Sequence, residues 1–335
     1  MTVTQHSTYD LLTSFWKHHP VADQQGESLA SKTIAFQEKF NCDFVKLMPA
    51  GSWQAACYGA IDTWEGDLLG RRTIKATIIQ QPSDWLNLPD FNETVPAMMQ
   101  QMIVAGTLVY EHIPSEVPIL CTLFCPITQA IQLAGLAVFT DHIKKHPEIV
   151  TAGLKQITKN TLLAIEAFKK AGVSGVFYAT QHMHVGALPK EIYDRFGAIF
   201  DTECLKACAD FRFNIFHIHS ENIYFSFDQL PKNCIIHYED SSKNPTADDF
   251  YAFSGLPLSL GIPISIMLAQ HSEKQIERFL RKHILKNPRS KFILAGCVLP
   301  LDFPDERLKK WLNCLKTIKN DVRFPRPNHN RISIF

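Results

Sequence analysis

The chain has 335 residues, of which 46% are hydrophobic and 20% are charged. This length and composition are sufficient for one large buried core, since α/β barrels often use about 250 residues or more as a single domain. The formal charge is only +1, so we expect neither nucleic acid nor an anionic membrane as a partner. No apolar run reaches the roughly 18 residues of a transmembrane helix.

Targeting and cysteine signals point to the cytoplasm. Residues 1–6 lack the basic-then-apolar layout of a secretory signal peptide. The nine cysteines have no regular spacing, which is typical of reduced thiols and small core residues rather than a disulfide framework. We therefore expect a cytoplasmic protein.

Strand-like and helix-like segments alternate along most of the chain. This alternation predicts βαβ units and a parallel sheet, and six to eight repetitions favour a closed barrel over an open sheet. Neither a G-x-G-x-x-G nor a P-loop motif occurs, which argues against a nucleotide-binding fold. The predicted strands are 43–48, 117–124, 174–179, 211–216, 233–238 and 291–295, with a further apolar stretch at 263–268. The predicted helices are 128–136, 147–172, 188–209, 272–284 and 304–318.

Residues 58–90 depart from this alternation. Two strand-like stretches flank the turn Gly66-Asp67-Leu-Leu-Gly70, which predicts a β-hairpin excursion around residues 60–80. The fold prediction is therefore an α/β protein with a single (β/α)8 TIM barrel, an N-terminal helical segment and this hairpin.

Two of the predicted strands end in potential metal ligands. The period of two along a strand places His217 and His219 on one face, about 6.5 Å apart. The strand at 291–295 ends at Gly296-Cys297. The C-terminal ends of barrel strands meet at one mouth, where such folds place their chemistry. Two imidazoles and one thiolate with an open fourth position are typical of a catalytic zinc site. Each residue taken alone is also typical of a buried core position.

Other polar residues lie near predicted strand ends. Glu221, Asp240 and His237 are candidates for a catalytic role, for a fourth metal ligand, or for hydrogen bonds that orient the ligands. Candidates for substrate binding are Lys46, Arg71, Arg72, Gln181 and His182. The arginine pair could clamp a carboxylate or phosphate, or it could be a solvated flank of the hairpin. Lys46 could contact an anionic substrate or pair with a carboxylate of the protein.

An ordered set of segments resembles the uroporphyrinogen decarboxylase superfamily, which also contains cobalamin-dependent methyltransferases. The resemblance implies a single barrel domain over residues 1–335, with its core at about 30–320 and its site in the C-terminal mouth. The matching segments are Asp43–Met48, Gly66–Gly70, Pro118–Thr128, His146–Glu148, Ala171–Tyr178, Phe216–His219 and Leu294–Pro300.

The two branches of this superfamily need different residues. The decarboxylase branch works without metal, and its Arg-Gln-Ala-Gly-Arg motif has no counterpart in residues 1–40. Its aspartate and tyrosine fall near Lys46 and Gln132 in this chain. The methyltransferase branch binds zinc through His-x-Cys and a later Gly-Cys. His217 and Cys297 match this pattern, and His219 stands in place of the first cysteine. The match is therefore incomplete, but histidine is also a competent zinc ligand.

The resemblance therefore implies a zinc-dependent enzyme that transfers a methyl or alkyl group with a thiol as substrate. The alternatives are a metal-free decarboxylase of uroporphyrinogen or another polycarboxylate, and a barrel that binds a ligand without catalysis. The substrate is expected to be a small molecule. No corrinoid-binding domain is visible in the sequence, so any corrinoid would arrive on a partner protein. A homodimer would suit the resemblance.

Overall fold

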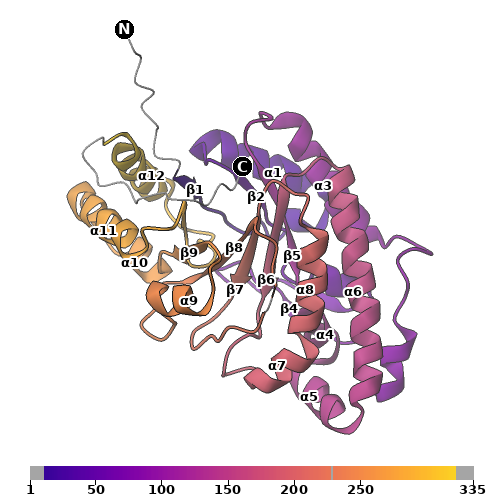
Figure 1. Cartoon of the computed structure of the whole chain (residues 1–335). Helices are drawn as coiled ribbons and strands as arrows, with labels where there is room; N and C mark the ends of the chain where they lie inside the picture. The colour runs from indigo at the N-terminus through magenta and orange to yellow at the C-terminus, as the bar shows by residue number, and fades with distance from the viewer. Residues whose placement is uncertain (1–10, 228, 322–335) are drawn as a thin grey trace.

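The computed structural model describes residues 11–227 and 229–321. Its centre is a ring of short parallel strands surrounded by helices (Figure 1). Six strands are hydrogen-bonded in the order β2-β5-β6-β7-β8-β9, and β1 pairs with β10 in parallel. The strands are β1 (Leu12–Ser14), β2 (Val45–Leu47), β5 (Ile119–Phe124), β6 (Gly175–Thr180), β7 (Asn214–Ile218), β8 (Cys234–Glu239), β9 (Leu258–Gly261) and β10 (Phe292–Leu294).

Further contacts close the ring between the two sheets. Ile262, directly after β9, forms a parallel bridge with Ala295, directly after β10. On the other side, the backbone N–H of Asp43 donates to the carbonyl of Thr13 at 2.9 Å, which joins β1 to the segment that enters β2. The eight strands thus follow one another around a barrel in sequence order, and the predicted fold class is confirmed.

Helices connect successive strands on the outside of the barrel (Figure 1). Helix α1 is the expected N-terminal helical segment, and α6 begins at Pro147 as predicted. The helices of eight or more residues are α1 (Gly26–Phe40), α3 (Ala97–His112), α4 (Pro126–Ala134), α5 (Leu136–Lys145), α6 (Pro147–Lys170), α8 (Ala198–Ala207), α11 (Glu273–Lys286) and α12 (Asp305–Asn320). The shorter ones are η1 (Ala22–Gln24), α2 (Trp53–Cys57), η2 (Pro82–Asn87), α7 (Lys190–Phe196), α9 (Ala247–Phe253) and α10 (Ile264–Leu268).

Three details differ from the sequence prediction. The helix expected over 188–209 is divided at Gly197 into α7 and α8. The apolar stretch 263–268 contains α10, and the strand β9 precedes it. The first strand, β1, was not predicted because its sequence, Leu-Thr-Ser, contains no apolar run. In contrast, β5 and β6 are buried at every position, as expected for parallel strands covered on both faces.

The predicted hairpin is present and lies over the barrel mouth. Its strands β3 (Ile61–Thr63) and β4 (Thr73–Ala76) pair in antiparallel fashion. The turn between them contacts the loop after β10, where the N–H of Leu301 donates to the carbonyl of Leu68 at 2.7 Å. Gly70 has φ +75, and a Cβ at this position would lie 2.4 Å from Cβ of His18. Only glycine therefore permits this close approach of the hairpin to the barrel.

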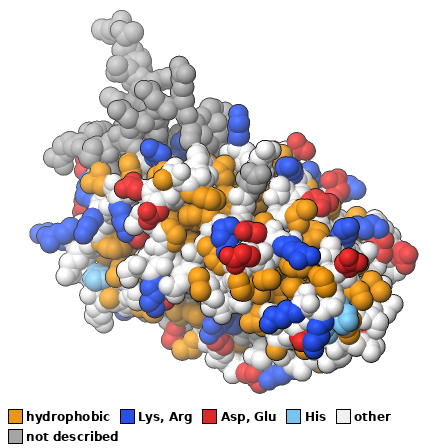
Figure 2. Space-filling model, turned by 60° about the horizontal axis from the view of Figure 1, so that its bottom comes forward, with side chains coloured by type: hydrophobic (Ala, Val, Ile, Leu, Met, Phe, Trp, Pro, Cys, Tyr) orange, Lys and Arg blue, Asp and Glu red, His pale blue; other side chains and the backbone are white. Residues whose placement is uncertain are grey.

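No helix in the described part of the chain is both long and apolar enough to cross a bilayer. On the face drawn in Figure 2, basic and acidic side chains are intermixed with apolar ones, and neither sign of charge dominates. This agrees with the formal charge of +1.

Candidate active site

Three side chains from two distant parts of the chain converge at the C-terminal mouth of the barrel. His217 lies in β7, His219 directly follows this strand, and Cys297 follows β10. Their ligand-type atoms all lie within 4.8 Å of one another. The Sγ atom of Cys297 lies 3.6 Å from Nδ1 of His219, and the two imidazole centroids are 5.8 Å apart. The structure therefore brings together the three residues that the sequence suggested as metal ligands.

The donor set of these residues fits a zinc ion. In tetrahedral sites, Zn–N bonds of about 2.0–2.1 Å and Zn–S bonds of about 2.3 Å place ligand atoms roughly 3.3–3.7 Å apart. The separation of 3.6 Å between Cys297 Sγ and His219 Nδ1 falls in this range. The largest separation in the group, 4.8 Å, requires a closure of about 1 Å, which small side-chain rotations supply. Three protein ligands also leave a fourth position for a substrate.

The thiol and imidazole at the mouth favour each other's charged forms. Burial alone would raise the pKa of the Cys297 thiol, but the hydrogen bond and charge of His219 outweigh it and lower this pKa. Burial alone would lower the pKa of His219, but the hydrogen bond with Cys297 outweighs it and raises this pKa. The site thus favours a thiolate at Cys297, which is the form that binds metals.

His217 is held from behind by a second histidine. His237 lies opposite His217 in the β7–β8 register, and their Nδ1 atoms are 2.9 Å apart. Burial lowers the pKa of His237 to about 3. Burial also lowers the pKa of His217 well below its usual value, and the neighbouring His237 adds to this effect. Both rings are therefore neutral. His237, a candidate for a catalytic or ligand-supporting role, does not line the cavity and instead contacts the ring of His217 from the barrel interior.

A cavity of about 280 Å³ opens directly beside the three residues. Its walls come from β2, β6, β7 and the hairpin, and all three candidate ligands line it. The further lining residues with aromatic or cationic side chains are Trp16, His18, Lys46, Arg71, Arg72, Phe124 and Phe177. Among the described residues, the cavity wall includes neither aspartate nor glutamate, so the charged side chains that line it are cations apart from the Cys297 thiolate.

Lys46 is the most unusual residue of this cavity. Its side chain is buried, with 8% of the residue exposed, and its Nζ atom lies 3.8 Å from the ring centre of Phe177 and 4.7 Å from that of Trp16. It forms no ion pair with a carboxylate in the described part of the chain. Burial lowers the pKa of Lys46 to about 7. An ammonium group in this place is therefore poorly compensated by the protein alone.

The two arginines of the hairpin also line the cavity, but each already has an acidic partner. The Nε atom of Arg72 lies 2.7 Å from Asp62, and its Nη1 lies 3.7 Å from the buried Asp23. The exposed Arg71 pairs with Asp67 at 2.6 Å. Arg72 therefore fixes the hairpin to the N-terminal segment, whereas Arg71 remains near the solvent.

Gln181 and His182 follow β6 and differ in their orientation. Gln181 lines the cavity. His182 does not, because its Nδ1 lies 3.2 Å from Oγ1 of Thr128 on the helical side of the barrel. Burial lowers the pKa of His182 to about 4.

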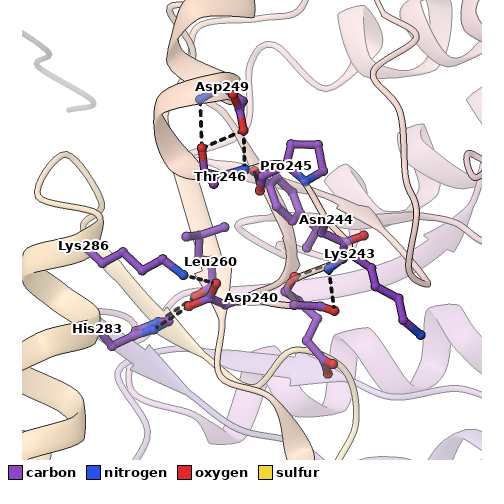
Figure 3. A network of polar contacts seen from close by, with 12 residues as sticks. Asp240, Lys243, Asn244, Pro245, Thr246, Asp249, Leu260, His283 and Lys286 are labelled. Carbon is purple, nitrogen blue, oxygen red and sulfur yellow. Dashed lines mark hydrogen bonds and ion pairs between the residues drawn. The ribbon is translucent and has the colours of Figure 1, made fainter.

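Glu221 and Asp240, expected near the metal ligands, instead form ion pairs elsewhere. Glu221 pairs with Lys243 at 2.6 Å, and its side chain is 45% exposed. Asp240 points toward α11, where it contacts Lys286 and lies 3.4 Å from Nδ1 of His283 (Figure 3). Neither residue lines the cavity. Their positions near strand ends in the sequence did not show that ion pairs with Lys243 and Lys286 hold them away from the cavity.

Sequence reasoning missed three residues around the site. Glu239 ends β8, and its charge helps to raise the pKa of His219. A Cβ added at Gly296 would lie 2.4 Å from Oε2 of Glu239. Gly296 before Cys297 thus leaves room for this carboxylate. His18 and Trp16 line the cavity from the segment after β1, and the short β1 gave no signal for them. For Glu239 the signal was available, since it ends the strand beside the one that bears the histidines.

Comparison with known families agrees with this architecture. The family model of uroporphyrinogen decarboxylase (URO-D) matches residues 20–318. The chain therefore belongs to the uroporphyrinogen decarboxylase family, a family of enzymes. A search of curated proteins finds no matching relative.

Among solved structures, the chain is similar in fold to proteins described as methyl-transferring enzymes. A methyltransferase from Methanosarcina mazei superposes with a TM-score of 0.74 at 14% identity, over 92% of this chain and 94% of that one. A putative vitamin-B12 independent methionine synthase from Listeria monocytogenes gives a TM-score of 0.56 at 11% identity, over 94% and 97%. A B12-independent methionine synthase from Shewanella sp. W3-18-1, solved with selenomethionine, gives 0.54 at 13% identity, over 89% and 87%. At these identities the similarity establishes the fold.

Proposed function

We propose that this protein is a zinc-dependent enzyme that transfers a methyl or other alkyl group to or from a small thiol substrate. The observation that supports this most strongly is the convergence of His217, His219 and Cys297 within 4.8 Å on the wall of a substrate-sized cavity. The fold similarity to a methyltransferase and to two methionine synthases favours the same chemistry.

The chain's own residues supply the ligands and the binding site. His217 offers a neutral nitrogen donor, His219 offers a nitrogen that gives up its proton when a metal binds, and Cys297 offers a thiolate. The chemistry that zinc supplies when bound is Lewis acidity, which keeps a substrate thiol deprotonated at neutral pH. The hairpin covers the mouth and limits the access of water. During transfer, the substrate sulfur forms a bond to the alkyl carbon while the bond from this carbon to its donor breaks. If the donor is a corrinoid, we expect a partner protein to carry it.

The charge of the cavity favours a thiol that carries a negative group. Lys46, Arg71 and Arg72 line the cavity, and no acidic residue does. Arg71 and Arg72 are paired with aspartates, whereas Lys46 has no carboxylate partner in the described ranges. We propose that the anionic end of the substrate lies against Lys46, because pairing there compensates a buried ammonium group.

The same charges argue against a decarboxylase of a tetracarboxylate. Such a substrate needs several cations that can pair with its carboxylates. Both cavity arginines are engaged by Asp62 and Asp67, and among the described residues Lys46 is the lining lysine or arginine that has no acidic partner. The cavity suits one anionic group better than four.

Elemental analysis of the untagged, zinc-replete protein tests the proposal. We expect about one zinc per chain in the wild type, and loss of this zinc in the double variant His217→Ala, Cys297→Ala. The matched control is Cys57→Ala, a free cysteine that does not line the cavity, which should keep its zinc. A folded, metal-replete wild type without zinc would refute the proposal. Chelator-insensitive turnover of uroporphyrinogen would support the decarboxylase instead.

A further inference from the structure

The contact between His217 and His237 has a consequence for the metal site. The two Nδ1 atoms face each other at 2.9 Å, and the ring centres are 4.8 Å apart. Both side chains are buried, with 6% and 0% exposure, and neither forms an ion pair with a carboxylate in the described part of the chain. Two neutral imidazoles in this geometry must hold complementary tautomers, because one Nδ1 has to donate the proton that the other accepts.

We propose that His237 is a positioning residue: its Nδ1 accepts a hydrogen bond from Nδ1–H of His217, and this fixes His217 in the tautomer whose Nε2 is free to bind a metal. The inference rests on the proposed function, because the bare Nε2 matters only if His217 is a ligand. The reverse tautomer would place a proton on Nε2 of His217 and would block this donor atom.

The surroundings of His237 favour the proposed arrangement. With Nδ1 directed at His217, the other nitrogen of His237 is Nε2. This atom has no hydrogen-bond partner among the described residues, but a contact with the backbone of Ala295 raises the pKa of the ring, as a carbonyl acceptor near a ring N–H does. A ring with its proton on Nε2 has a bare Nδ1, which is the acceptor that His217 requires.

The fold also reserves the space for this ring. A Cβ at Gly261, the last residue of β9, would lie 2.7 Å from Nε2 of His237 and 2.4 Å from Cα of Gly296. Glycine at this position therefore lets the His237 ring pass close to β9 and to the residue before Cys297. His237 does not line the substrate cavity, and His217 is the candidate ligand with which it shares a hydrogen bond.

The first test uses zinc affinity, measured by competition with a chromogenic chelator. His237→Phe keeps a ring of similar size but removes the acceptor, whereas His237→Asn places an amide oxygen close to the former Nδ1. Loss of such an outer partner typically weakens metal binding about 10- to 100-fold. We expect His237→Phe to lose affinity in this range and His237→Asn to recover most of it. The control is His142→Phe, a buried histidine that accepts from Trp85 and lies remote from the cavity, which should bind zinc as the wild type does.

The second test does not require zinc. Nitrogen-15 shifts of labelled histidines distinguish the two neutral tautomers, and His217 in the metal-free wild type should report a protonated Nδ1 and a bare Nε2. In His237→Phe this signal should change to a mixture of tautomers while circular dichroism shows a folded protein. A wild type without zinc would refute the proposed function but leave this readout intact. A His217 protonated on Nε2 in the wild type, or equal zinc affinity in folded His237→Phe, would overturn the inference itself.

Discussion

The buried lysine of the cavity allows a sharp prediction about stability and function. Lys46→Met keeps the length and apolar part of the side chain but removes the amine. The fall in the pKa of Lys46 from 10.5 to about 7 corresponds to roughly 4–5 kcal/mol at 1.36 kcal/mol per pKa unit. This is the order of the penalty that the folded protein carries when Lys46 is protonated. We therefore expect Lys46→Met to be more stable than the wild type at pH 6, by up to a few kcal/mol.

The pH dependence follows from the direction of this shift. Because the folded pKa lies below the unfolded one, the unfolded chain binds more protons at Lys46 between pH 7 and 10.5. Stability of the wild type therefore gains from this group as pH rises through that window. The advantage of Lys46→Met should be largest at pH 7 and below, and it should vanish near pH 10.5. The exposed Lys155→Met in α6 is the matched control and should show no such trend.

The assay is urea unfolding of the metal-free protein at pH 6 and pH 9.5, together with binding of a small anionic thiol at pH 7. We expect the stabilised variant to bind this ligand more weakly, because the Lys46 amine pairs with the anionic group of the substrate and does not stabilise the folded protein. A Lys46→Met protein that is less stable than the wild type at pH 6, with an unchanged pH dependence, would refute this reasoning.

Two further predictions concern the hairpin and the helical layer. Arg72→Met leaves the buried Asp23 and Asp62 without their cation. We therefore expect a loss of about 3–5 kcal/mol in unfolding free energy and faster proteolysis within residues 60–80. The control Arg71→Met, at an exposed position, should lower the unfolding free energy by about 0–1 kcal/mol, and equal effects of the two substitutions would contradict the assigned roles. Gly153→Ala would place a Cβ 2.7 Å from Cε3 of the buried Trp85, so tryptophan fluorescence during urea unfolding should report a loss of about 1–3 kcal/mol. Gly255→Ala, with nothing within 4 Å of its Cβ, should leave stability nearly unchanged, and a similar loss in both variants would argue against crowding at Trp85.

The sequence was most informative where long segments carry a clear period. The buried runs of β5 and β6 and the helix from Pro147 were identified closely, because hydrophobic patterning and the C-terminal glycine signal are local properties. The strands β1 (Leu-Thr-Ser) and β9 (Leu-Ser-Leu-Gly) were not, since neither contains an apolar run. Gly197 divides a helix that the pattern alone would continue.

For the site, spacing along one strand and the parallel order of strands predicted which residues could meet. His217, His219 and Cys297 converge for that reason. Side-chain direction at strand ends depends on partners that are distant in sequence. Lys243 and Lys286 hold Glu221 and Asp240 away from the cavity, and the β7–β8 register places His237 against His217. None of these contacts is encoded in a local pattern.

X-ray absorption spectroscopy of the zinc-loaded protein tests the central claim most directly, because it counts the ligands of the ion. We expect one sulfur at about 2.3 Å and two imidazole nitrogens at about 2.0–2.1 Å, with a light atom in the fourth position. Addition of a thiol substrate should replace that light atom with a second sulfur, and Cys297→Ser should remove the first. A zinc shell without sulfur in the wild type, or one unchanged by Cys297→Ser, would contradict the account.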